Sequence, residues 1–280
     1  MLSVIIRSVM ILLLAALGKA SALNVICVGG SSGMGKASAL EVVRNGGKVL
    51  LVSRSLTKLE SARQELLTQV PGADVSIADL DVSDEGAVEK FAETLRESST
   101  ESWDALVVSA AGKAPHGPVE TLPTSDTRLM METKVWTAYH CAKHLGPLLQ
   151  EGGAICFVAG ILNRRPGLNC APLAMANGAL EGLTRTLALE WGPKLRVNCL
   201  SPGFCDTERF DHMPAQRKEQ MMSNTAASLP LQKVGQPSDM GQAIYYLLTA
   251  PFCTGVILDV DGGHGIRQYA NPMKDPMRRS

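Results

Sequence analysis

Three glycines in one short turn mark the part of the chain best suited to ligand chemistry. Gly29, Gly33 and Gly35 follow the apolar run 24–28 and precede a stretch of helical periodicity. Glycines at a strand-to-helix turn let the backbone bend sharply and approach a pyrophosphate, and the helix N-terminus adds free N–H groups. The turn therefore predicts a dinucleotide site; the alternative is a tight turn without a ligand. The residues expected to line it are Gly29, Ser31, Ser32, Gly33, Met34 and Gly35.

The end of the second apolar run indicates which dinucleotide binds. A site for NAD favours an acidic residue here, which binds the ribose 2′-hydroxyl, whereas a 2′-phosphate favours an arginine. Ser53 stands where the acid would be expected, and Arg54 follows it. A guanidinium can bind a phosphate through two hydrogen bonds. NADP(H) is therefore the predicted cofactor, and the alternative is that Arg54 is an ordinary solvated arginine.

These residues need a framework that brings them together. From Leu23 onward, short β-rich apolar runs alternate with longer amphipathic stretches, a pattern typical of βαβ units and of a parallel sheet covered on both faces. The predicted strands are 24–28, 48–52, 74–78, 105–109, 154–158, 195–200 and 256–260. The predicted helices are 33–45, 57–69, 84–97, 125–150, 171–191 and 238–248, with a helical excursion within 204–229. We predict the α/β fold class, with residues 23–280 as one doubly wound, Rossmann-like domain.

Composition narrows the class of protein. The 280 residues include 27 Lys+Arg and 27 Asp+Glu, so the net charge gives no support to nucleic acid as a partner. A hydrophobic fraction of 45% excludes a disordered chain and suits one large domain with a sizeable core. The seven cysteines form no C-x-x-C pair, which predicts buried free thiols and no disulfide frame or zinc site.

Residues 1–22 differ in composition from the rest. A positively charged start with Arg7, an unbroken apolar run over 9–17 and the triplet Ala20-Ser21-Ala22 are the three parts of a secretory signal peptide. The run is short for a membrane span. We expect a signal peptide or an N-terminal hydrophobic segment that directs the protein to the secretory pathway or associates with a membrane. A non-targeting extension on a cytoplasmic protein is the alternative, and the unpaired cysteines suit it.

Several motifs in matching order resemble the short-chain dehydrogenase/reductase family over nearly all of 24–263. They are Gly29, Gly33 and Gly35, Asp81-Val82, Ala111-Gly112, Arg196-Val197-Asn198, Ser201-Pro202-Gly203 with Thr207, and Val260-Asp261-Gly262-Gly263. The resemblance implies that Asp81 lies beside the adenine ring and that the segment 201–207 contacts the nicotinamide end. It adds Asp81, Ala111, Gly112, Pro202, Gly203 and Thr207 to the predicted cofactor site.

The same resemblance fails at the residues that carry the family's chemistry. The family uses a serine, a tyrosine and a lysine four residues after the tyrosine. Ala159 stands at the serine position, Leu173 at the tyrosine and Asn177 at the lysine. Leu173 and Ala159 have no group that transfers or donates a proton. A Y-x-x-x-K pattern does occur at Tyr139 and Lys143, but it precedes the 154–158 strand, so it is expected to be an accident of helical spacing.

Lys134 is the candidate catalytic residue. It takes the place where the family usually has an asparagine near the active site. A lysine buried beside a dinucleotide loses solvation, its pKa falls, and it can donate a proton to a carbonyl. The alternative is a solvent-facing lysine on a helix. Four further residues have two possible interpretations. Arg164-Arg165 either clamps an acidic substrate or is solvated, while His116 and His264 are either near the pocket or structural.

Two functions remain open on these grounds. The first is an NADP(H)-dependent oxidoreductase that acts on a small carbonyl or alcohol through an altered proton relay. An enzyme without a general acid can still position the cofactor and the substrate for hydride transfer, so such an enzyme is physically reasonable. The second is a catalytically impaired NADP(H)-binding or scaffold protein that keeps the fold. The resemblance also implies a homodimer or homotetramer built through the helices predicted at 125–150 and 171–191.

Overall fold

A seven-stranded parallel sheet forms the centre of the molecule in the computed structural model, which describes residues 22–98 and 102–266. The strands are β1 (Asn24–Val28), β2 (Lys48–Ser53), β3 (Asp74–Asp79), β4 (Trp103–Val108), β5 (Leu149–Val158), β6 (Arg196–Pro202) and β7 (Ile257–Val260). Their order in the sheet is β3-β2-β1-β4-β5-β6-β7. The direction in which strands are added reverses between β1 and β4, and ligands of such folds bind at this reversal, beyond the carboxyl ends of the strands.

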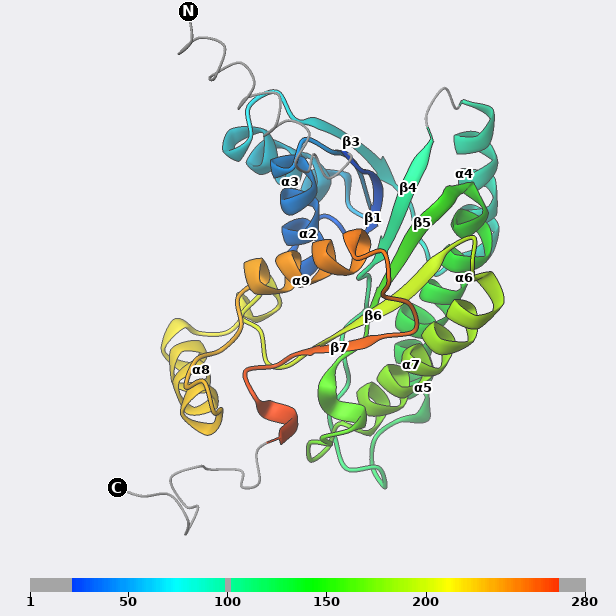
Figure 1. Cartoon of the computed structure of the whole chain (residues 1–280). Helices are drawn as coiled ribbons and strands as arrows, with labels where there is room; N and C mark the ends of the chain where they lie inside the picture. Colours follow the sequence, from blue (N-terminus) through cyan, green and yellow to red (C-terminus); the bar gives the residue numbers. More distant parts are fainter. Residues whose placement is uncertain (1–21, 99–101, 267–280) are drawn as a thin grey trace, which may run out of the picture.

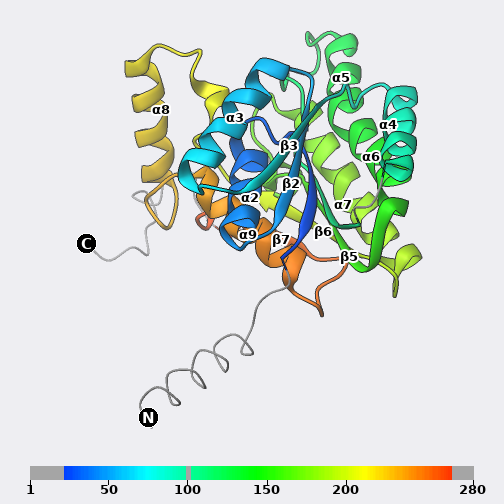
Figure 2. The same cartoon turned by 90° about the horizontal axis from the view of Figure 1, so that it is seen from above.

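Helices cover both faces of this sheet (Figures 1 and 2). The main helices are α2 (Gly33–Arg44), α3 (Leu56–Gln69), α4 (Glu85–Glu97), α5 (Thr124–Met130), α6 (Thr137–Leu145), α7 (Ala171–Trp191), α8 (Ala215–Ser228) and α9 (Pro237–Thr249). On one face α2, α3 and α9 pack on the side chains of Val25 and Cys27, and on the other α4, α6 and α7 pack on those of Ile26 and Val28. Successive residues of a strand point to opposite faces, so each strand contributes to both cores.

The predicted fold class is confirmed, and most elements end within two residues of their predicted bounds. The exceptions are the predicted helix 125–150, which is wrong at its C-terminal end, and the predicted strand 154–158, which begins five residues earlier, at Leu149. α6 ends at Leu145, a 3-10 turn covers Gly146–Leu148, and β5 already begins at Leu149. Pro147 has no N–H and so cannot donate the hydrogen bond to the carbonyl four residues earlier that would continue the α-helix. Between α5 and α6 the helix also widens into the π-helical segment η1 (Met131–Trp136), which contains Lys134.

The cysteines are free, as predicted. Cys27, Cys141, Cys156, Cys199 and Cys205 are buried, and Cys170 and Cys253 are partly exposed. No helix within 22–98 and 102–266 is both long enough and apolar enough to cross a membrane. The predicted signal or anchor at 1–22 falls, except for Ala22, outside the described residues.

Candidate functional site

The glycine-rich turn joins β1 to α2 in a conformation that depends on its glycines. Gly29 has φ of +83° and Gly33 has φ of +55°, values that side-chain-bearing residues rarely adopt. A Cβ atom on Gly29 would lie 2.6 Å from the amide nitrogen of Ala110, just beyond the end of β4. A Cβ on Gly35 would overlap Ser109 Oγ and the carbonyl of Gly29. The turn is thus pressed against the carboxyl end of β4, at the reversal of strand order.

An anion already sits at this turn, and it belongs to the chain itself. The N–H of Gly33, at the start of α2, donates to Glu208 Oε2 at 2.8 Å, and Lys36 Nζ lies 2.8 Å from Glu208 Oε1. Glu208 lies in the 3-10 turn η4 (Glu208–Phe210), directly after Thr207, whose side chain faces Gly33. Here the carboxylate stands in for a phosphate oxygen. The turn therefore fits the pyrophosphate of a dinucleotide.

Removal of the Glu208 charge is expected to tighten NADPH binding. A pyrophosphate and the Glu208 carboxylate compete for the same N–H of Gly33, and Lys36 attracts both. We expect Glu208→Gln to lower the Kd for NADPH on the order of tenfold in titration calorimetry, because the amide is a weaker competitor for these donors. Glu219→Gln, on the exposed side of α8, is the matched control. Unchanged or weaker NADPH binding by Glu208→Gln would contradict the assignment.

The other predicted cofactor residues follow the strands on either side of the turn. Arg54 is exposed after β2, and Asp81 lies after β3. A hydrogen bond from the Ser83 hydroxyl lowers the pKa of Asp81, and the charge of Arg54 contributes to the same shift. Ala111 and Gly112 follow β4, and Pro202 and Gly203 end β6 and begin the loop to Thr207. All of these predicted residues therefore gather at the carboxyl edge of the sheet.

Lys134 is buried, so the alternative of a solvent-facing helix lysine is wrong. It has 7% of its surface exposed, and its Nζ donates to the carbonyl oxygen of Ala159 at 2.9 Å, just beyond β5. Loss of solvation lowers the pKa of Lys134 to about 8, and the positive charge of Arg209 acts in the same direction. Lys134 is the buried residue of the π-helical segment η1, and such segments are frequent at functional sites.

The wall opposite Lys134 is built from α7. Leu173, at the family's tyrosine position, packs against the small apolar cluster of Ala114, Met130 and Ala176, as Met131 and Val135 of η1 also do. Asn177, one turn later, has 1% of its surface exposed, and its Oδ1 has no hydrogen-bond partner among the described residues. Ala159 is buried and provides its carbonyl to Lys134. Lys134 thus contacts Ala159 directly, and Asn177 lies against Gly160, the next residue.

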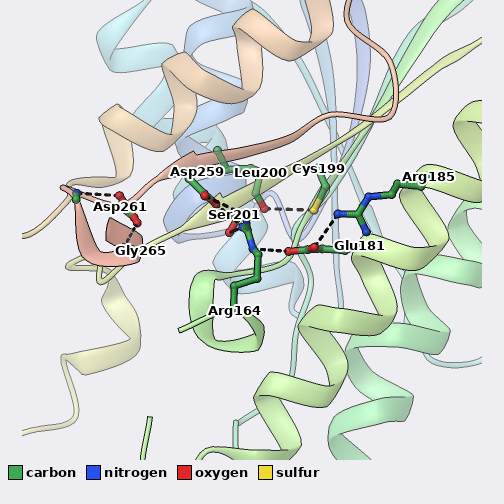
Figure 3. Close-up of polar contacts among 10 residues, drawn as sticks. Arg164, Glu181, Arg185, Cys199, Leu200, Ser201, Asp259, Asp261 and Gly265 are labelled. Carbon is green, nitrogen blue, oxygen red and sulfur yellow. Dashed lines mark hydrogen bonds and ion pairs between the residues drawn. The ribbon is translucent and has the colours of Figure 1, made fainter. Parts of the chain in front are cut away.

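Arg164 forms ion pairs within the protein while its side chain stays 38% exposed, and its two predicted roles stay predictions. Its Nε lies 3.1 Å from Glu181 Oε1 of α7, and its terminal nitrogens bind Asp259 of β7 and, at 2.8 Å, Ser201 Oγ of β6 (Figure 3). Arg185 adds a second ion pair to Glu181 at 3.0 Å. The loop after β5 is therefore tied to three elements by one guanidinium. Nothing in the local sequence around Glu181 or Asp259 predicts this network.

Loss of Arg164 is expected to destabilise the fold. Glu181 is 4% exposed, and Arg164→Met leaves this buried carboxylate with Arg185 alone. We expect the free energy of unfolding, measured with urea, to fall by about 1–2 kcal/mol, less than for a fully buried pair because the Arg164 side chain is 38% exposed. Arg185→Met, at a more exposed position on the same carboxylate, should cost less. Equal losses in the two variants would contradict this ranking.

The remaining candidate residues are the Tyr139–Lys143 pair, His116 and His264. Lys143 pairs with Glu85 of α4 at 2.6 Å, and Tyr139 is exposed on α6, so this Y-x-x-x-K pair lies on α6, before β5. His116 Nδ1 lies 3.0 Å from the carbonyl of Ala114 in the loop after β4. His264 begins the short turn η5 (His264–Ile266), directly after the closing glycines.

The known proteins that this chain resembles agree with the fold and the dinucleotide turn described above. A family model described as enoyl-(acyl carrier protein) reductase covers residues 28–265. Carbonyl reductase family member 4 of Danio rerio is 30% identical over 240 residues, which cover 85% of this chain and 96% of that protein. A small-chain dehydrogenase solved in complex with NADPH is 30% identical, with a TM-score of 0.71, covering 88% of this chain and 99% of the other. An apo short-chain oxidoreductase of Pseudomonas aeruginosa PAO1, described as containing an atypical catalytic center, is 25% identical, with a TM-score of 0.79, over 88% and 98% of the two chains.

Proposed function

This chain belongs to the short-chain dehydrogenase/reductase family, and on that premise we propose that it is an NADP(H)-dependent oxidoreductase with Lys134 as its proton donor. The substrate is a small carbonyl compound or the corresponding alcohol. The observation that carries the proposal is the buried Lys134 ammonium, held 2.9 Å from the Ala159 carbonyl at the carboxyl end of β5. It is a proton-bearing group in direct contact with Ala159, one of the three positions where the family's catalytic residues are replaced.

NADP(H) fits the residues that gather at the carboxyl edge of the sheet. The turn of Gly29, Gly33 and Gly35 would hold the pyrophosphate, as its contact with the Glu208 carboxylate supports. Arg54 would hold the 2′-phosphate, and Thr207 the nicotinamide end. The NADPH complex of the 30% identical dehydrogenase supports the same cofactor. When bound, the reduced cofactor supplies a hydride to the carbonyl carbon.

Lys134 provides the proton that balances the reduction. Its Nζ donates a proton to the carbonyl oxygen as the carbon gains the hydride, which yields an alcohol, and the resulting amine is reprotonated from solvent. A pKa of about 8 keeps the ammonium mostly protonated at neutral pH, yet makes it a much better acid than an ordinary lysine. The side chains of Ala159 and Leu173 contribute apolar surface only, and the low polarity would strengthen the interaction of the ammonium with the substrate oxygen.

The test combines binding and turnover. Titration calorimetry with NADPH and with NADH establishes cofactor binding, and the loss of NADPH absorbance is then followed with a panel of ketones, aldehydes and quinones. We expect NADPH to bind more tightly than NADH and at least one carbonyl compound to be reduced. Binding without turnover, together with turnover gained by Leu173→Tyr plus Asn177→Lys, would favour the impaired or scaffold protein instead.

Assembly as a homodimer or homotetramer is part of the proposal. Trp136 and Tyr139 pack edge to face near the start of α6, and both side chains are about half exposed. Aromatic residues are enriched at protein–protein interfaces, so these exposed rings favour a subunit contact here. A second copy of the chain is the proposed occupant of this surface. Light scattering coupled to size-exclusion chromatography tests it, and a monomer at micromolar concentration would contradict it. Targeting or membrane association through residues 1–22 stays a prediction.

A further inference from the structure

Two segments from distant parts of the chain carry positive charge to the carboxyl edge of the sheet. The first is η1 with Lys134, which lies against the segment after β4, because a Cβ atom on Gly112 would come within 2.4 Å of Thr133 Oγ1. The second is η4 with Arg209, which follows β6. The charge of Arg209 acts on Lys134, so the two cations lie within electrostatic range of each other.

The turn that carries Arg209 is held on both sides of that residue. On one side Glu208 accepts a hydrogen bond from the N–H of Gly33 at 2.8 Å. On the other side the ring of Phe210 stacks on the ring of Phe204, with 5.2 Å between their centroids. The aromatic contact does not use the N–H that a pyrophosphate would take, so it can hold the turn when the cofactor is bound. Arg209 is exposed between these contacts, and a ligand can reach its guanidinium.

Neither cation pairs with a carboxylate within residues 22–98 and 102–266. Lys134 Nζ donates to the carbonyl of Ala159, and the titratable groups that act on it are Cys199 and Arg209. The Cys199 thiol supplies no anion, because burial raises its pKa to about 12. No acidic group in those ranges acts on Arg209, and partial burial lowers the pKa of its guanidinium. This part of the site therefore carries two uncompensated positive charges.

Other cations around the site do face carboxylates. Lys36 Nζ lies 2.8 Å from Glu208 Oε1, and Arg164 Nε lies 3.1 Å from Glu181 Oε1 (Figure 3). Like charges that lie close together without a counter-ion cost free energy, and the cost rises where solvation is reduced. A bound anion recovers that free energy. The two unpaired cations therefore favour a negatively charged ligand.

The chemistry of the proposed reaction indicates which anion this is. Lys134 needs a carbonyl oxygen before it, and a guanidinium binds a carboxylate through two parallel hydrogen bonds. We propose that the substrate is a small oxo acid, with Arg209 binding its carboxylate and Lys134 facing its carbonyl oxygen. This inference rests on the proposed function, because it names the substrate class of the same site. A phosphate of the cofactor is the competing source of an anion for Arg209, and the experiment separates the two.

The first measurement compares oxo acids with their methyl esters, which have the same carbonyl group but no negative charge. Pyruvate, 3-oxobutanoate and 4-oxopentanoate vary the spacing between carboxylate and carbonyl, and the loss of NADPH absorbance measures their reduction. We expect kcat/KM for the best acid to exceed that for its ester by about tenfold or more, because only the acid makes a charge-assisted contact with Arg209. The absence of a preference for any acid would overturn the proposal.

Variants of Arg209 test whether this residue is the source of the preference. Arg209→Gln removes the charge, and it should lower kcat/KM for the acid about tenfold more than for the ester. Arg209→Lys keeps a positive charge and should restore part of the preference. Arg217→Gln is the matched control, because it removes another exposed arginine, on α8, and the preference should match that of the wild-type protein. An equal loss for acid and ester in Arg209→Gln contradicts the assignment.

The second measurement identifies the source of the anion. The Kd for NADPH in Arg209→Gln should stay within about threefold of the wild-type value, whereas a rise of about tenfold would assign Arg209 to a cofactor phosphate and overturn the proposal.

A protein that binds NADPH but reduces no carbonyl compound would contradict the proposed function, and the inference can still be decided. Calorimetry then measures the binding of the three acids and their methyl esters to the NADPH complex. Tighter binding of an acid than of its ester, lost in Arg209→Gln, supports the carboxylate contact. Equal binding of every acid and its ester overturns it.

Discussion

Replacement of Lys134 with methionine is expected to lower NADPH-dependent carbonyl reduction by about 10²–10⁴-fold, the usual contribution of a general acid. Methionine has a similar length and suits the buried position, so the fold and the cofactor turn should be retained. The Kd for NADPH should stay within about threefold, because positioning of the cofactor depends mainly on residues other than Lys134. Stopped-flow or steady-state loss of NADPH absorbance measures the turnover, and calorimetry measures the binding.

The pH dependence of the reduction rate is an independent test of the role of Lys134. Lys134 must be protonated to donate, and burial lowers its pKa from 10.5 to about 8. The rate of reduction should therefore be constant below about pH 7 and fall tenfold per pH unit well above pH 8. Alcohol oxidation, which needs the neutral amine, should rise through the same range. Lys143→Met, an exposed lysine on α6 that pairs with Glu85, should change neither rate. Unchanged turnover in Lys134→Met would exclude Lys134 as the donor.

Replacement of Arg54 with serine is expected to raise the Kd for NADPH on the order of 100-fold and to change the Kd for NADH by less than about threefold. The difference arises because a bidentate guanidinium–phosphate contact is among the stronger charge-assisted hydrogen bonds, and only NADPH carries the 2′-phosphate. Arg54 is exposed after β2, free to reach a phosphate near Asp81. Calorimetry with the two reduced cofactors at one salt concentration measures both values, since screening weakens exposed charge pairs.

The control for Arg54 is Arg63→Ser on α3, which removes an exposed arginine from the following helix without approaching the cofactor turn. Its two dissociation constants should match those of the wild-type protein. A parallel loss of affinity for both cofactors in Arg54→Ser would point to a disturbed turn. A wild-type preference for NADH would show that Arg54 does not bind a 2′-phosphate at all.

The sequence by itself determined the α/β class, the order of the elements and the place of the dinucleotide turn. The bounds of β1 (Asn24–Val28) and α7 (Ala171–Trp191) follow directly from the apolar periodicity, because local side-chain patterns dictate which face of an element is buried. The end of α6 was missed although Gly146 and Pro147 are a local signal. The two apolar residues beyond them, Leu148 and Leu149, belong to the 3-10 turn and to β5 and not to the helix.

Only the tertiary structure decided how the charged side chains are used. Lys134 meets a carbonyl 25 residues away, Arg164 meets a carboxylate 95 residues away, and Glu208 reaches the N–H of Gly33 across 175 residues. The type of each residue is compatible with a solvated surface position, which is the commonest one for lysine, arginine and glutamate. Whether such a side chain is buried, and what it faces, depends on elements that are distant in the chain and adjacent only in the folded sheet. No local pattern carries that information.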